Sequence, residues 1–169
     1  TTSGAAASRY VVGCVRKKYP ASGTGFTFPI GNSTLYTPVT QTFNTTAGVA
    51  GDVTACVNSP DHPQVISPVP TTGINSTRSV NRYWTLTANA GGFGTPTGLY
   101  GVSFGYDNGD NDGGANSTNY IVQRFSSVWF PTTLSTGANN TTATTTNNQT
   151  KDYGDYAIGE PFSGFSAAS

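Results

Sequence analysis

The sequence predicts an all-β fold, an antiparallel β-sandwich of the immunoglobulin-like or fibronectin-like type with about nine or ten short strands. Three observations predict it. Only 9% of the 169 residues are charged, so Thr, Ser, Asn and Gly must build the polar surface, and these residues favour strands and turns. Leucine is rare and methionine is absent, so a helix is hard to place anywhere. Short runs that alternate apolar and polar residues recur between turn signals.

The alternating runs predict the strands in order. Residues 1–8 are small and featureless and are expected to form a flexible arm. Residues 80–87 (VNRYWTLT) and 100–106 (YGVSFGY) alternate most clearly, and Val102, Phe104 and Tyr106 fall on one face. Strands are expected at 9–17, 26–28, 39–43, 53–57, 80–87, 100–106, 120–125, 127–130, 141–146 and 156–158.

Turn chemistry separates these strands. Residues 20–25 predict a Pro/Gly turn, and residues 107–116 predict an Asp/Asn/Gly loop. Residues 59–77 hold four of the ten prolines and predict a long irregular connection. Because no linker or internal repeat divides the chain, we expect one domain over residues 1–169.

Composition and cysteine content predict an exported protein. A chain that begins Thr1-Thr2-Ser3 without methionine is expected to be either a processed protein or an excised fragment, and removal of a signal peptide is the simplest cause. Cys14 and Cys56 fit one disulfide in an oxidising compartment, with two buried thiols as the alternative. Eight basic residues balance eight acidic ones, which argues against nucleic acid as a partner. No run of about 20 apolar residues predicts membrane insertion.

Five phrases, taken in order, resemble a β-sandwich segment of large secreted bacterial surface proteins of the adhesin-like and autotransporter-like kind. The phrases are YVVGCVRKKYP (10–20), FTFPIGNSTLYTPVT (26–40), SVNRYWTLT (79–87), NYIVQRF (119–125) and DYGDYAIGEP (152–161). The resemblance implies a role in surface attachment at the cell surface and no catalytic constellation. It does not account for Cys14 and Cys56, and the segment here lacks the long repetitive region such modules follow. A small crosslinked sandwich on its own is more typical of a polymer subunit.

A sandwich can polymerise when an extended arm of one subunit completes a neighbour's sheet. The candidate arm is residues 1–8, continuing into a strand-like run whose apolar members are Tyr10, Val11, Val12 and Val15. Pairing of this run within its own domain is the alternative. The expected partners are therefore further copies of the chain and surface glycans.

Two groups of residues suggest site chemistry. His62 stands beside Asp61 between prolines, but no nucleophile or metal-ligand motif accompanies it, so an ordinary loop histidine and a non-enzymatic protein are expected. Asp107, Asp110 and Asp112 supply oxygen ligands of the kind that Ca²⁺ takes, while Asp-Gly and Asn-Gly are also ordinary turn chemistry.

Seven Asn-x-Thr sequons are candidates for glycosylation, with a Thr/Asn-rich composition as the alternative explanation. The asparagines are Asn32, Asn44, Asn75, Asn116, Asn139, Asn140 and Asn148.

The aromatic residues leave a second function open. Tyr83 and Trp84 point to opposite faces of one strand, and we expect one of them to be buried together with Phe104 and Phe125. An exposed aromatic row would instead favour a carbohydrate-binding module. The leading hypothesis is a structural or adhesive surface protein, followed by this module and then by a phage or capsid surface protein.

Overall fold

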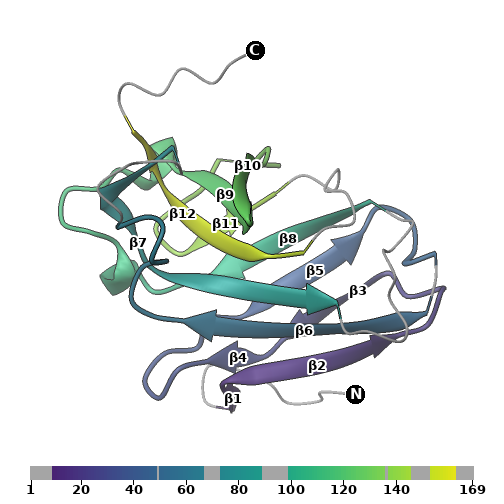
Figure 1. Cartoon of the computed structure of the whole chain (residues 1–169). Helices are drawn as coiled ribbons and strands as arrows, with labels where there is room; N and C mark the ends of the chain where they lie inside the picture. Colours follow the sequence, from purple (N-terminus) through teal and green to yellow (C-terminus); the bar gives the residue numbers. More distant parts are fainter. Residues whose placement is uncertain are drawn as a thin grey trace.

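The computed structural model describes residues 9–48, 50–66, 73–88, 99–135, 137–145 and 153–162, and these residues form strands joined by loops and two short 3₁₀ turns (Figure 1). The all-β prediction is confirmed, and each of the ten expected strands has a counterpart. The strands are β1 (Val11–Val12), β2 (Cys14–Tyr19), β3 (Gly25–Phe28), β4 (Ile30–Gly31), β5 (Val39–Phe43), β6 (Gly51–Asn58), β7 (Ile74–Ala88), β8 (Tyr100–Gly105), β9 (Ile121–Ser126), β10 (Val128–Pro131), β11 (Thr142–Thr144) and β12 (Asp155–Pro161). The 3₁₀ turns are η1 (Asn108–Asp110) and η2 (Ser117–Asn119).

Two antiparallel sheets form the sandwich. The larger sheet has the strand order β10-β9-β12-β7-β6-β2, and the smaller one has the order β11-β8-β5-β3. Figure 1 shows the larger sheet in front, with β8, β5 and β3 crossing behind it. A short parallel pair, β1 with β4, lies at one end. The larger sheet is two strands wider than the sheet opposite.

The first expected strand is divided in two. Gly13 interrupts it with a φ of 113°, a conformation that L side chains rarely adopt. The chain pairs with β4 before this glycine and with β6 after it. Residues 59–77 were expected to be irregular throughout, and this is wrong for 74–77. Ile74 begins β7, because its buried side chain packs with Val65 under the preceding loop.

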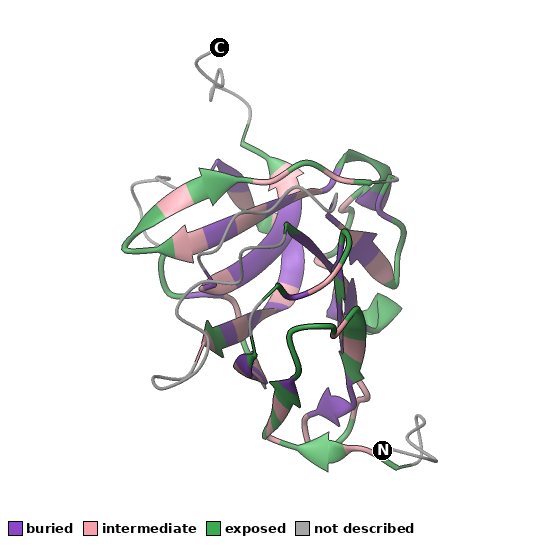
Figure 2. Ribbon diagram, turned by 90° about the vertical axis from the view of Figure 1, so that its right-hand side faces the viewer, coloured by how far each residue is buried: buried purple, intermediate pink, exposed green. Residues whose placement is uncertain are grey.

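Aromatic side chains fill the space between the sheets. Trp84 and Phe104 are fully buried with their rings 5.0 Å apart, and Tyr156 follows 5.1 Å from Phe104. Figure 2 shows buried residues alternating with more exposed ones along the strands. Tyr83 and Phe125 are only half-buried, since they point to the outer face of the larger sheet. The prediction that one of Tyr83 and Trp84 is buried together with Phe104 and Phe125 is thus confirmed for Trp84 and Phe104 and wrong for Phe125, whose side chain points away from the core.

The core also contains polar groups that bond to one another. The Gln41 amide donates to the Tyr153 hydroxyl (2.6 Å) and accepts from the Tyr19 hydroxyl (3.3 Å). The hydroxyls of Tyr100 and Tyr156 lie 2.9 Å apart. Burial raises the pKa values of Tyr19 and Tyr153 well above the usual range. These phenols therefore remain neutral, Tyr19 as the donor and Tyr153 as the acceptor, and both ends of the buried amide have a partner.

A disulfide joins Cys14 to Cys56 within the chain. The two residues face each other in the β2–β6 register, so the bond ties an edge strand to its neighbour. The sequence prediction of this crosslink is confirmed. In the part of the chain that the structure describes, no helix is long and apolar enough to cross a membrane.

Replacing both cysteines by alanine should lower the free energy of unfolding by about 4 kcal/mol, because the bond closes a loop between residues 42 positions apart and restricts the unfolded chain. Urea unfolding of the wild type and of the double variant measures this loss. Intact mass with and without reductant, which differs by two protons when one disulfide is present, confirms the bond in the wild-type sample. A loss below about 1 kcal/mol would contradict the expected contribution.

Candidate functional site: an aromatic cleft beside an edge strand

An aromatic cluster covers part of the outer face of the larger sheet. The loop that follows β6 brings His62 over the sheet, where its ring lies 4.8 Å from that of Tyr83, 5.1 Å from Phe125 and 5.0 Å from Trp129. The three partners come from β7, β9 and β10, and Phe125 pairs directly with Trp129 across two strands. Their alternation with inward residues places all three on one side of the sheet.

Hydrogen bonds fix the orientation of His62. Its Nε2 lies 3.0 Å from a carboxylate oxygen of Asp155, and its Nδ1 accepts the backbone N–H of Gln64 at 3.1 Å. Nδ1 is therefore the acceptor and Nε2 carries the proton that is donated to Asp155. Thr85 donates to the other oxygen of Asp155 at 2.6 Å. Both ring nitrogens are occupied and the side chain is 5% exposed, so His62 works here as a positioning residue for the aromatic rings.

A cleft of about 420 Å³ opens next to this cluster. Its lining residues are Gln64, Phe125, Ser127, Val128 and Trp129. The cleft thus combines two aromatic rings and a valine with one amide and one hydroxyl, and none of the five side chains is charged. A flatter hollow of about 530 Å³ lies over β3 and β5; it is more open to solvent, and half of its ten lining residues are threonines, together with Phe26 and Phe43. The cleft beside the ring cluster is the better ligand site because it is less open and so contacts a ligand on more sides.

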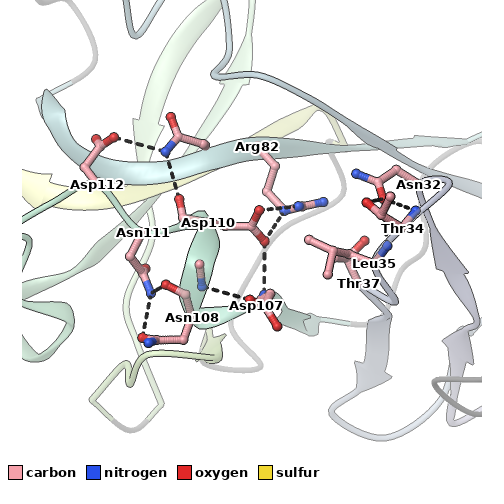
Figure 3. A network of polar contacts seen from close by, with 12 residues as sticks. Asn32, Thr34, Leu35, Thr37, Arg82, Asp107, Asn108, Asp110, Asn111 and Asp112 are labelled. Atoms are coloured by element: carbon pink, nitrogen blue, oxygen red, sulfur yellow. Dashed lines mark hydrogen bonds and ion pairs between the residues drawn. The ribbon is translucent and has the colours of Figure 1, made fainter.

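The predicted Ca²⁺ loop is used for internal bonding. Asp110 forms a two-fold ion pair with Arg82, from Nε at 2.8 Å and from a terminal nitrogen at 2.5 Å (Figure 3). Asp112 accepts from the backbone N–H of Ser79 at 2.8 Å and from the Asn81 amide at 3.0 Å. Asp107 caps the 3₁₀ turn η1. The three carboxylates therefore turn toward different donors, and among the described residues no three His, Cys, Asp or Glu side chains are grouped to hold a metal ion.

Asp61 and Asp112 approach the same hydroxyl from two loops. Ser79 Oγ lies 3.1 Å from Asp112 and 3.4 Å from Asp61. Burial raises the pKa of the Asp61 carboxyl to about 6; the negative charge of Asp112 contributes to this rise, while the bond from Ser79 acts in the opposite direction. One oxygen of Asp61 is buried without a hydrogen-bond partner. Asp61 therefore keeps its proton to a higher pH than an exposed aspartate does, and it is mostly ionised at neutral pH.

The Asn-x-Thr triplets prove to be a turn motif. In four of them the Asn side-chain oxygen accepts both the backbone N–H and the hydroxyl of the Thr two residues later. The two distances are 2.9 and 3.0 Å at Asn32, 3.0 and 3.0 Å at Asn75, 3.2 and 2.7 Å at Asn116, and 2.9 and 3.1 Å at Asn139. The excess of sequons thus has a structural cause that the sequence analysis did not consider. Asn44 and Asn140 are exposed, Asn148 lies outside the described residues, and glycosylation of all seven stays a prediction.

The candidate assembly arm is paired within its own chain. Tyr10 packs against Tyr36 with ring centroids 5.5 Å apart, and Val11 and Val12 pair with β4. Val15 belongs to β2 and packs against the core, next to the Cys14 disulfide. Residues 1–8 lie outside the described residues. Exchange of this run between subunits would require it to leave all of these contacts.

Sequence reasoning missed two residues that organise this region. The position of Arg82 could have been predicted from the sequence. It lies in the same alternating series as the buried Val80, Trp84 and Leu86, and this series places its guanidinium on the inner face. Asp155 had none, since only the pairing of β12 with β7 and β9 brings it to His62. Phe125 was expected in the core, and its position on the outer face beside Trp129 was not predicted.

No protein-family model, curated protein or solved structure matches this chain. The resemblance to bacterial surface proteins therefore stays a prediction that depends on the five sequence phrases.

Replacing Asp110 by asparagine should cost about 3 kcal/mol of stability, because it leaves the buried Arg82 charge uncompensated. Asp107→Asn is the matched control, since Asp107 is exposed and asparagine keeps its capping oxygen. Chemical denaturation of both variants measures the difference. Equal, small losses in the two proteins would show that the ion pair contributes little.

Asp61→Asn should raise stability at pH 8 and leave it unchanged at pH 4. The pKa of Asp61 is about 6 in the folded chain and about 3.9 in the unfolded chain, so the unfolded chain releases this proton at a lower pH. The free energy of unfolding therefore falls as pH rises from about 4 to 6. Asparagine does not ionise, so the variant lacks this decrease in stability. The gain at pH 8 should be about 1 kcal/mol, discounted because the carboxyl is partly solvated. Thermal unfolding across this pH range tests it, and a wild-type profile parallel to that of Asp61→Asn would refute the assignment.

Proposed function

We propose that the protein is a non-enzymatic extracellular building block, structural or adhesive in role, that associates with a second copy through the edge strand β10. The observation that carries this proposal is the character of that strand. Its four residues carry no charge, and Val128 and Phe130 are 57% and 39% exposed. No strand pairs with its outer side among the described residues. An uncharged edge with unpaired backbone groups is a template for strand addition, and here the new ladder would extend only over residues 128–130, because Pro131 has no N–H to donate.

The exposed apolar side chains of β10 lie at the edge of the wider sheet. Phe130 stands opposite Arg124 in the β9–β10 register and shares a face with it. The Arg124 guanidinium lies 4.7 Å from the Phe130 ring. Val128 and Phe130 remain in contact with solvent. A second copy would cover these apolar side chains.

The other three edges are protected. β2 carries Arg16, Lys17 and Lys18, and charged side chains discourage strand addition. Lys17 also extends its ammonium to 5.0 Å from the Phe26 ring, which places a charge at the β3 edge. The outer side of β11 is covered by residues 134–135 through a bridge from Leu134 and a bond from the Ser135 N–H. This contrast supports β10 as the associating edge.

A second copy of the chain is the partner that best fits this edge. An uncharged strand meets its own copy without like-charge repulsion, and antiparallel pairing of β10 with β10 joins two larger sheets into one. Such an interface is isologous and closes a two-fold dimer. The dimer would be the unit of a surface assembly. Strand exchange through Tyr10, Val11, Val12 and Val15 is less favoured, because these residues already pair within the chain.

The extracellular location rests on the crosslink. A disulfide that joins two neighbouring strands persists in oxidising compartments and is rare in the cytosol. Low charge also removes the long-range repulsion that keeps copies apart. Both features suit a protein that packs against copies of itself outside the cell.

Phe130→Glu should abolish self-association, because pairing of the two edges would bury a carboxylate. In the monomer the carboxylate lies beside the Arg124 guanidinium, so we expect the variant to fold. Phe162→Glu is the matched control, with a phenylalanine of nearly equal exposure, 40%, outside β10. Light scattering after size exclusion, over a hundredfold range of concentration, measures the mass. We expect dimers or larger species for the wild type and Phe162→Glu only. A wild type that stays monomeric throughout, or an associating Phe130→Glu, would overturn the proposal.

A further inference from the structure

We infer that the cleft between Gln64 and the β9–β10 hairpin binds a neutral pyranose, such as a residue of a surface glycan. The inference adds a ligand to the building block proposed above and does not depend on pairing at β10. The cleft lies on the outer face with Trp129 and Phe125, whereas Phe130 points to the inner face.

The chemistry of the lining selects the ligand class. None of the five lining side chains is charged, so the cleft offers no counter-charge to a phosphate, carboxylate or ammonium group. It offers two aromatic ring faces together with an amide and a hydroxyl. A pyranose has the complementary surface, with an apolar C–H face for the rings and hydroxyls that exchange hydrogen bonds with Gln64 and Ser127. The volume of about 420 Å³ lies within the range of small-molecule sites.

The aromatic walls are positioned before any ligand binds. Phe125 and Trp129 hold their rings 5.1 Å apart at 52°, and His62 contacts both from behind. His62 is itself fixed by Asp155 and by the N–H of Gln64. The inner part of Trp129 packs on the small apolar cluster of Val65, Ile74 and Ala157. Ligand binding therefore loses little side-chain entropy at the site. This small cost matters for sugars, which bind weakly.

The same bond network places the polar wall. Gln64 donates its backbone N–H to His62, so its exposed side chain begins next to the ring cluster. Ser127 occupies the tip of the β9–β10 turn with a φ of 69° and also lines the cleft. The two polar residues thus reach the cleft from two separate loops.

The test uses methyl α- and β-pyranosides of glucose, galactose, mannose and N-acetylglucosamine with the full chain. Binding is measured by saturation-transfer NMR and calorimetry. Tryptophan emission gives a third signal, which reports Trp129 because the only other tryptophan, Trp84, is fully buried. Each measurement is repeated in Phe130→Glu, so that loss of self-association and loss of sugar binding are separated.

We expect at least one pyranoside to bind with a Kd below about 10 mM, in both the wild type and Phe130→Glu. Gln64→Ala and Trp129→Leu should weaken that binding at least tenfold. The control variants Gln123→Ala and Phe162→Leu, which change a glutamine and an aromatic residue outside the cleft, should bind as the wild type does. Circular dichroism establishes that each variant is folded. The inference is overturned if no pyranoside of the panel binds, or if Gln64→Ala and Trp129→Leu bind as tightly as the controls.

Discussion

A guanidinium in the middle of a sandwich is the constraint on which this structure depends. Arg82 sits on the inner face of β7 and is 2% exposed, so its charge would be very costly without a partner. Asp110 supplies that partner from the loop after β8. The loop must therefore fold back over the sheet, and Asp107 and Asp112 hold it there by capping η1 and by bonding to β7. The loop with Asp107, Asp110 and Asp112 has the composition of a cation site, but its carboxylates bind the loop to strand β7 instead.

The outer face of the same strand anchors the second loop. Ser79 and Thr85 bond to Asp61 and Asp155, and Asp155 in turn bonds to His62. Strand β7 thus has polar side chains that bond to loops on both of its faces. In most antiparallel sandwich strands, the face toward the core is apolar. The proposed ligand cleft exists because the 59–66 region is held against β7 and β12 in this way. Its aromatic walls are a consequence of loop docking as much as of sheet packing.

The sequence predicted the strands well because their side chains alternate, and alternation reports which face is buried. It also predicted the crosslink, since two cysteines leave one possible pair. It did not predict the site, because His62, Asp155 and Trp129 meet only through strand pairing between distant segments. The Asn-x-Thr triplets show a different limit. The pattern that suggests glycosylation is the pattern that closes an Asx turn, so composition alone could not distinguish the two.

The two proposed interfaces share one hairpin but have different aromatic residues, and the period of a strand explains how. Neighbouring residues of β10 point to opposite faces, so Trp129 lines the cleft while Phe130 points to the other face, and Val128 at the start of β10 also borders the cleft. A slip of one residue in the β9–β10 register would exchange these roles and bring Phe130 toward His62. The tight turn at Ser127 and the ring contact between His62 and Trp129 both oppose that slip. The ring contacts of the buried His62 therefore join the loop after β6 to the edge strand.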